Sequence, residues 1–166
     1  MMNKTDLEII SHNIGKSKIS LVQIINYLHT EKIMAALIQE VSNDDDIADE
    51  IRSAAKHKQY TIHYPKPDSL PGVAIILHNS LHIRQIFKDS SLEILAVRVG
   101  TSDKQNAHTM LVSARCPDGV DDLPEKTERD NIQKKIQLVT KTYDKLLELV
   151  TTFKHDNFIS RNPPPD

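Results

Sequence analysis

The sequence predicts an α/β fold, in which a strand–helix–strand unit is followed by short strands and a final long helix. Three patterns support this. Two β-prone segments flank an amphipathic helix near the N-terminus, short apolar segments alternate with polar turns in the middle, and an apolar stripe recurs at helical spacing near the C-terminus. The chain has 166 residues, 39% hydrophobic and 27% charged, so we expect one packed domain and no wholesale disorder.

The strand–helix–strand unit occupies residues 7–40. Residues 7–13 are β-prone and end in polar side chains, and residues 35–40 are an apolar run that closes on Gln-Glu, as a buried parallel strand does where it leaves a core. Ser17 is a candidate cap for the helix between them. The apolar residues of that helix recur at helical spacing and are Leu21, Ile24, Ile25 and Leu28. Together these segments predict a βαβ unit.

A second helix is predicted after Ser42, which has capping-box spacing to Asp45. Its apolar face carries Ile47, Ile51, Ala54 and Ala55. The acidic run 44–46 has two interpretations, a cation site or favourable charge at a helix N-terminus, and we favour the second.

From residue 59 the pattern changes to short strands. The alternating segment 60–64 stops at Pro65, and a Pro-containing loop leads to Gly72. The next strands are expected at 73–77, 83–87, 94–99 and 109–114, with the rhythm of an antiparallel meander.

A last helix is predicted to begin at Asp122. It has an apolar stripe, most simply interpreted as core packing, that consists of Ile132, Ile136, Val139, Tyr143, Leu146, Leu147 and Val150. A further strand is expected to start at 157–159, and the prolines at 163–165 cannot continue a central strand.

Two polar residues follow the first two predicted strands. They are Asn13 and Glu40. Ligands of open α/β sheets gather at the carboxyl ends of the strands, so the two side chains could meet at one edge. A carboxylate there is a suitable oxygen ligand for Mg²⁺, and an amide could hydrogen-bond a phosphate. The simpler interpretation is that Glu40 is only a solvated residue after a strand.

Three segments occur in order and at suitable spacing, ISHNIG at 10–15, ALIQE at 36–40 and GVAIIL at 72–77. They resemble the opening of the endonuclease/exonuclease/phosphatase superfamily, especially the retrotransposon-type endonucleases. In that family the first strand ends in Asn, and the second ends in Gln-Glu whose Glu binds the divalent metal. The resemblance implies that Asn13 and Glu40 are catalytic residues and that Glu40 binds Mg²⁺ or Mn²⁺.

The resemblance covers nearly all of the chain but only about half of the family domain. It implies half of a four-layer α/β-β/α sandwich, with one mixed sheet flanked by helices, over residues 1–160 and a disordered tail at 161–166. The later Gly-Asp-Phe-Asn and Ser-Asp-His elements are not found in the sequence, and the segment Arg115–Pro117 lacks the Tyr of the family's Tyr-x-Pro. We therefore expect a truncated, weakly active or inactive domain. Its uncovered sheet face implies self-association, pairing with another polypeptide, or marginal stability.

The charges are nearly balanced, with 21 Lys and Arg against 23 Asp and Glu. This excludes a general cationic surface, although a nucleic acid or another phosphoester could still bind locally. Because the chain has a single cysteine, Cys116, no intrachain disulfide can form. Because no Cys/His signature surrounds it, we interpret it as packing and not as a nucleophile. No signal peptide or membrane-spanning run is evident, and we expect an intracellular protein without membrane contact.

Two other interpretations stay open at this point. The chain could be a non-catalytic interaction module that reuses the half-fold, or a small α/β protein whose similarity is accidental. Metal-dependent cleavage would separate the hydrolase from the interaction module. Strand order would separate both from the accidental case, because the strands ending at Asn13 and Glu40 must then be neighbours.

Overall fold

The computed structural model describes residues 7–15, 18–41, 45–64, 72–89, 92–100, 108–115 and 128–161. Their helices and strands, in chain order, are β1 (Ile9–Asn13), α1 (Lys18–Glu31), β2 (Ala35–Gln39), α2 (Asp45–His57), β3 (Tyr60–His63), β4 (Val73–His78), β5 (His82–Asp89), β6 (Ile94–Gly100), β7 (His108–Ala114) and α3 (Glu128–Arg161). The chain divides into two compact units, residues 1–115 and residues 116–166. Each unit is described by itself.

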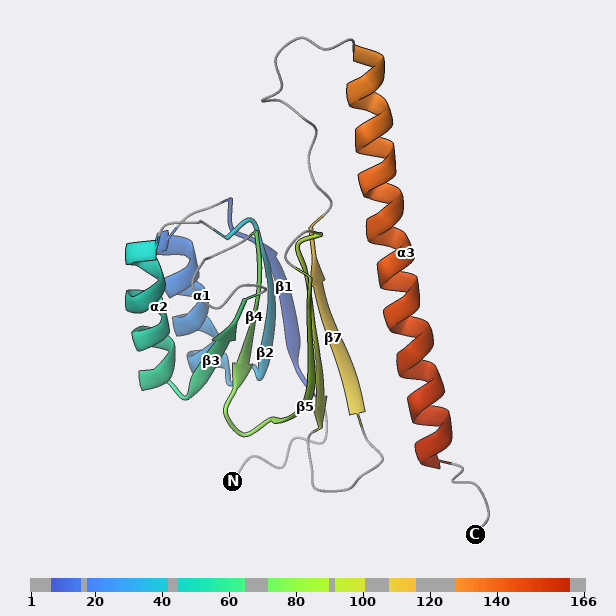
Figure 1. Cartoon of the computed structure of the whole chain (residues 1–166). Coiled ribbons are helices and arrows are strands. Elements are labelled where there is room, and N and C mark those ends of the chain that lie inside the picture. Colours follow the sequence, from blue (N-terminus) through green and yellow to red (C-terminus); the bar gives the residue numbers. More distant parts are fainter. Residues whose placement is uncertain are drawn as a thin grey trace. The chain divides into compact units, whose positions relative to one another are not determined.

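The first sheet of unit 1 has the strand order β1-β2-β4-β3. The strands β1 and β2 are parallel, as the predicted βαβ unit requires, and β4 runs antiparallel to both β2 and β3. Helices α1 and α2 cover one face of this sheet (Figure 1). The four apolar residues predicted to line α1 are all buried there, as are Ile51 and Ala55 of α2.

The second sheet is an antiparallel meander of β5, β6 and β7. It packs on the face of the first sheet that the helices leave free (Figure 1), through a core that includes Val73, Ile75, Leu77, Leu95 and Val97. The α/β sandwich class is confirmed. The expectation that the inner face of the first sheet is uncovered is wrong, because β5, β6 and β7 form a second sheet that buries this face. The strand at 73–78 was expected to belong to the antiparallel meander. This expectation is wrong, because the strand pairs with β2 and β3 of the first sheet.

One end of the first sheet is closed by helix termini. Lys32 follows α1 with a φ of 58°, and the Ile33 N–H then donates to the Leu28 carbonyl at 3.0 Å. This is how a left-handed residue satisfies a carbonyl at a helix end. The Tyr60 hydroxyl lies 2.9 Å from the Leu28 carbonyl and 2.8 Å from that of Ile33, so it joins β3 to this turn.

Unit 2 is described through α3. The expected strand at 157–159 is wrong, because α3 continues to Arg161. No proline or glycine interrupts residues 128–161. Pro163 disfavours a helical conformation of the residue before it, Asn162. The predicted cap Asp122 lies outside the described residues.

The apolar stripe predicted for the last helix lies along α3, which the structure describes as one continuous helix. Its interpretation as core packing stays a prediction. None of the described helices is long and apolar enough to cross a membrane.

Candidate active-site rim

The parallel pairing of β1 and β2 brings the two predicted site positions to one edge of the first sheet. In the register of this pair, Asn13 stands opposite Gln39, the residue directly before Glu40. The Ile14 N–H donates to the Gln39 carbonyl at 3.1 Å and extends the pairing beyond Asn13. Asn13 and Glu40 therefore leave neighbouring strands at the same end. We call this end the rim, and define it by Asn13, Glu40 and the residues next to them.

The backbone at the rim turns sharply after each strand. Glu40 has a φ of 57°, a left-handed conformation that non-glycine residues seldom adopt and that strains the backbone. Asn13 makes an Asx turn, in which its side-chain oxygen accepts a hydrogen bond from the Gly15 N–H at 3.0 Å. The Asn13 amide group is thus oriented by its oxygen, which leaves its NH₂ group as the available donor.

A polar layer beneath the rim joins the two sheets. The Gln39 side-chain amide donates to the hydroxyls of Ser11 and Ser113 at 3.4 Å each, and the Ser113 hydroxyl donates to the Ile38 carbonyl at 3.0 Å. Ser113 belongs to β7 of the second sheet and is 1% exposed, so its partners satisfy a buried hydroxyl. Sequence reasoning missed Ser113. The only available signal was a small polar residue inside an apolar strand.

The second sheet contributes two more polar side chains to the same end, Glu93 and Arg115. The Arg115 N–H donates to the Glu93 carbonyl at 3.2 Å, and an Arg115 Nη1 atom lies 3.6 Å from Glu93 Oε2. Gly72, at the start of β4, stands next to them: a Cβ built on it would meet the Glu93 carboxylate. No motif in the sequence indicated that these residues come together.

Solved structures share this fold at low sequence identity. A humanized D. rerio TDP2 with 14 mutations matches at a TM-score of 0.53 and 16% identity, covering 83% of this chain and 56% of its own. TDP2 from C. elegans matches at 0.52 and 16% identity, covering 98% and 47%. D. rerio TDP2 complexed with single-strand DNA product matches at 0.53 and 12% identity, covering 85% and 56%.

The chain has the fold of the endonuclease/exonuclease/phosphatase superfamily. The predicted resemblance is thereby confirmed for the fold, and the accidental-similarity interpretation is excluded at that level. The chain spans about half the length of the structures that it matches. The sequence matches no protein-family model and no curated protein.

The endonuclease/exonuclease/phosphatase fold places Asn13 and Glu40 at neighbouring strand ends, and the donor set there can be compared with what a cation needs. Among the described residues, no group of three or more His, Cys, Asp or Glu side chains could hold a metal ion. Mg²⁺, however, usually keeps several waters and takes one or two carboxylates plus substrate phosphate. The Glu40 carboxylate suits that mode of binding, whereas a closed, all-protein cage does not fit.

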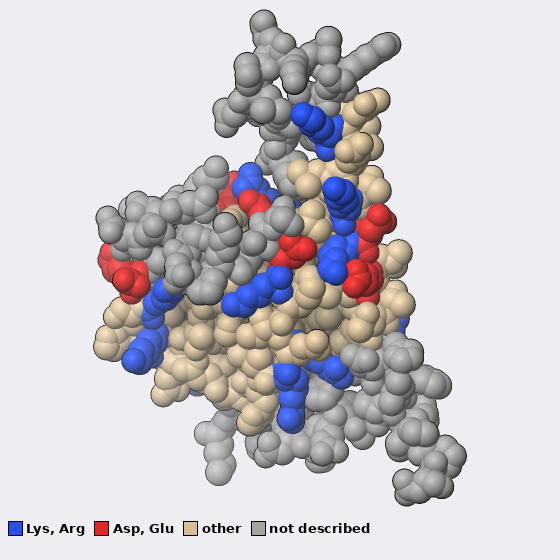
Figure 2. Space-filling view, in the orientation of Figure 1, with Lys and Arg blue, Asp and Glu red and all other residues tan. Residues whose placement is uncertain are grey.

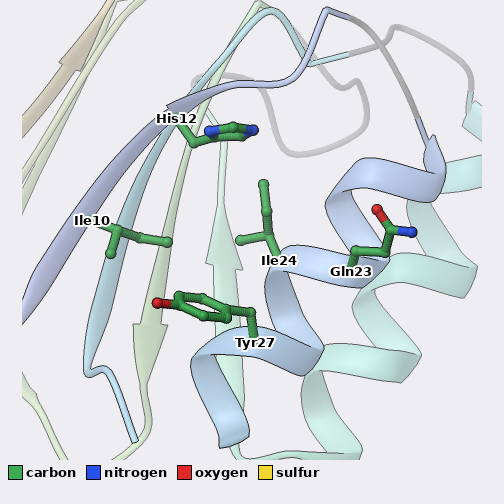
Figure 3. A pocket seen from close by; sticks show the side chains of 5 residues that line it. All are labelled: Ile10, His12, Gln23, Ile24 and Tyr27. Atoms are coloured by element: carbon green, nitrogen blue, oxygen red, sulfur yellow. The ribbon is translucent and has the colours of Figure 1, made fainter. Parts of the chain in front are cut away.

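A separate pocket lies on the helix-covered side of β1. Ile10 and His12 of β1 face Gln23, Ile24 and Tyr27 of α1 across it (Figure 3). Because side chains alternate along a strand, His12 points to the face opposite that of Asn13. The pocket is therefore not part of the rim.

The other residues weighed from sequence do not add to the rim. Asp44 and Cys116 lie outside the described residues, and the side chains of Asp45 and Asp46 are likewise not described. On the face shown in Figure 2, basic and acidic side chains are interspersed, with uncharged residues between them. An anionic ligand on this face would therefore depend on a few local cations.

Proposed function

We propose that this chain is the metal-binding part of a metal-dependent phosphodiester hydrolase domain. The proposal depends on the parallel pairing of β1 and β2. This pairing brings Asn13 and Glu40 to the same rim of a sandwich with the endonuclease/exonuclease/phosphatase fold. The strained Glu40 backbone adds support, because left-handed non-glycine residues cluster at functional sites.

Each rim residue has a distinct role in this proposal. The Glu40 carboxylate binds Mg²⁺ or Mn²⁺, which when bound would neutralise the charge that develops on a phosphate. The Asn13 NH₂ group donates to a phosphate oxygen, and its Asx turn with Gly15 holds it in place. The hydrogen-bonded layer of Gln39 and Ser113 fixes β2 against the second sheet and so fixes the strand that carries Glu40.

The proposal assigns no water-activating group to the described residues of the rim. The family elements that would supply a water-orienting Asp and a His–Asp pair are not found in the sequence. A positioned base contributes roughly a hundredfold to ten-thousandfold to such a reaction. We therefore propose that the chain by itself binds the cation and the phosphodiester but turns it over at close to the uncatalysed rate.

The test combines Mn²⁺ affinity with turnover of a short single-stranded oligonucleotide in Mg²⁺ or Mn²⁺. The ligand follows from D. rerio TDP2, which was solved with a single-strand DNA product. The native chain should bind Mn²⁺, and Glu40→Gln should weaken the affinity by about tenfold or more. Glu31→Gln, a matched change at an exposed carboxylate at the end of α1, should leave it unaltered.

Two results would contradict the proposal. Equal Mn²⁺ affinities in the native chain and in Glu40→Gln would remove the assignment of the metal to Glu40. Robust metal-dependent turnover that Glu40→Ala abolishes would show that these residues already contain a competent base. A chain that binds Mn²⁺ through Glu40 but no oligonucleotide would favour the non-catalytic interaction module.

A further inference from the structure

The pair of Glu93 and Arg115 lies at the end of the second sheet that meets the rim. Ile94 and Ala114 are register partners at the ends of β6 and β7, so the next residues outward are Glu93 and Arg115. Their backbones are joined by the 3.2 Å bond from the Arg115 N–H, and their side chains by the 3.6 Å ion pair. The Arg115 side chain is 23% exposed and the Glu93 side chain 29%, which leaves each of them partly open to solvent.

Gly72 connects this pair to Glu40. Gln39 and Val73 are register partners of β2 and β4, so the next positions outward are Glu40 and Gly72, and the Val41 N–H donates to the Gly72 carbonyl at 3.3 Å. A Cβ on Gly72 would meet the Glu93 carboxylate and would lie 3.1 Å from Arg115 Cδ. The ion pair therefore lies against the strand beside Glu40, and a side chain at position 72 would make the Glu93 carboxylate shift.

Stability alone does not account for this arrangement. A partly exposed ion pair contributes roughly 0–1 kcal/mol. Glu93 has a left-handed φ of 49° as the last residue of the turn between β5 and β6. The 3.6 Å ion pair holds the guanidinium beside this turn, at the end of the second sheet that meets the rim.

We propose that Arg115 binds a phosphate of the phosphodiester at the rim and that Glu93 is the positioning residue that holds its guanidinium there. The inference rests on the proposed function, since it assigns the phosphate-recognising cation of that same site. Arginine carries a planar fork of five donors, so one part can face Glu93 while another faces phosphate oxygens. An oriented guanidinium of this kind matches the geometry of a phosphate group better than a mobile lysine does.

The experiment measures binding of a fluorescent single-stranded oligothymidylate by anisotropy over a series of salt concentrations, in EDTA so that no metal takes part. Arg115→Gln should weaken binding by about tenfold and lower the slope of log affinity against log salt by about 0.7, one phosphate contact on a single strand. Arg115→Lys should keep the slope but lose about threefold in affinity, because a lysine offers charge without the fork. Arg84→Gln, at an exposed site on β5, is the matched control and should change neither quantity.

Glu93→Gln and Gly72→Ala test the positioning role. Both keep the Arg115 charge, so both should keep the salt slope while weakening affinity by about threefold, provided that melting curves show a folded protein. Tighter binding in Glu93→Gln would mean that the carboxylate competes with the ligand, and would overturn the positioning role. Should Arg115→Gln fail to fold, Arg115→Lys and Glu93→Gln still carry the test.

Failure of the inference can be told from failure of the proposed function. An unchanged affinity and slope in Arg115→Gln, with only a lower melting temperature, would make the pair a structural contact. No measurable binding by the native chain would also overturn the inference. Loss of the Glu40 effect on Mn²⁺ affinity would instead overturn the proposed function, because the oligonucleotide experiment contains no metal.

Discussion

The two ends of the first sheet use the same unusual backbone conformation for different purposes. Lys32 and Gln59 at one end, and Glu40 and Glu93 at the rim, all have left-handed φ values between 49° and 65°. Lys32 and Gln59 each follow a helix, where hydrogen bonds such as Gln59 N–H to the Lys56 carbonyl at 3.1 Å complete the helix end.

At the rim, neither left-handed residue ends a helix. Both are glutamates, and Glu93 lies against Gly72 of the other sheet. The difference teaches that strain at the helix-capping end is explained by chain geometry alone. At the rim, Glu93 lies in the turn between β5 and β6, and we propose that the left-handed φ of Glu40 serves to place its carboxylate. This comparison leads to the following predictions.

The largest expected effect on stability is at the helix-capping end. Tyr60→Phe removes the hydroxyl that reaches the carbonyls of Leu28 and Ile33 in a buried turn, and should lower the free energy of unfolding by about 1–3 kcal/mol. Urea denaturation measures this, and Mn²⁺ affinity should stay unaltered. A loss below about 0.5 kcal/mol would show that this end does not depend on its hydrogen bonds.

Glycine substitutions compare the two ends directly. Both Lys32→Gly and Glu40→Gly relieve a left-handed Cβ, so neither should destabilise the fold, and each could raise the free energy of unfolding by up to about 1 kcal/mol. Only Glu40→Gly should weaken Mn²⁺ binding. The comparison breaks if Lys32→Gly weakens metal binding equally, or if Glu40→Gly unfolds the chain.

The smallest expected effect concerns two histidines of the first sheet. The pKa of His63 is lowered by burial and by the Lys88 charge, and the pKa of His78 by burial and by His29. Below the ordinary value of 6.5 the unfolded chain therefore binds more protons than the folded chain.

The contribution of these histidines to stability should therefore be full above pH 6.5, fall as the pH drops below that value, and level off below the lowered pKa values of the folded chain. Unfolding free energies at about pH 8 and about pH 5.5 measure the loss. His63→Gln and His78→Gln should each make it smaller. An unchanged pH dependence in both variants would mean that other groups cause it.

Local patterns in the sequence predicted the elements better than their partners. Helix α1 and strand β2 were predicted because their apolar periodicity reflects the faces that they bury. The pairing of β4 with β2 was missed, since a short apolar strand carries no information on its neighbour. The strand expected at 157–159 was wrong because β-prone letters were given more weight than an uninterrupted helix.

Half of the rim could be predicted and half could not. The neighbouring ends of β1 and β2 follow from the βαβ pattern, and the resemblance pointed to Asn13 and Glu40, whose roles stay a prediction. Glu93 and Arg115 come from the second sheet, so only tertiary packing brings them to Gly72. The left-handed φ of Glu40 is also a tertiary property, because glutamate does not favour it locally.

The most direct test is to locate a bound cation on the folded chain. Mn²⁺ titrated into isotope-labelled protein broadens the NMR signals of amides close to it. The account predicts selective broadening at the rim, around Gly15, Val41 and Gly72, which Glu40→Gln removes and Glu31→Gln does not. Broadening centred on the helix-capping end, or broadening at the rim that survives Glu40→Gln, would contradict it.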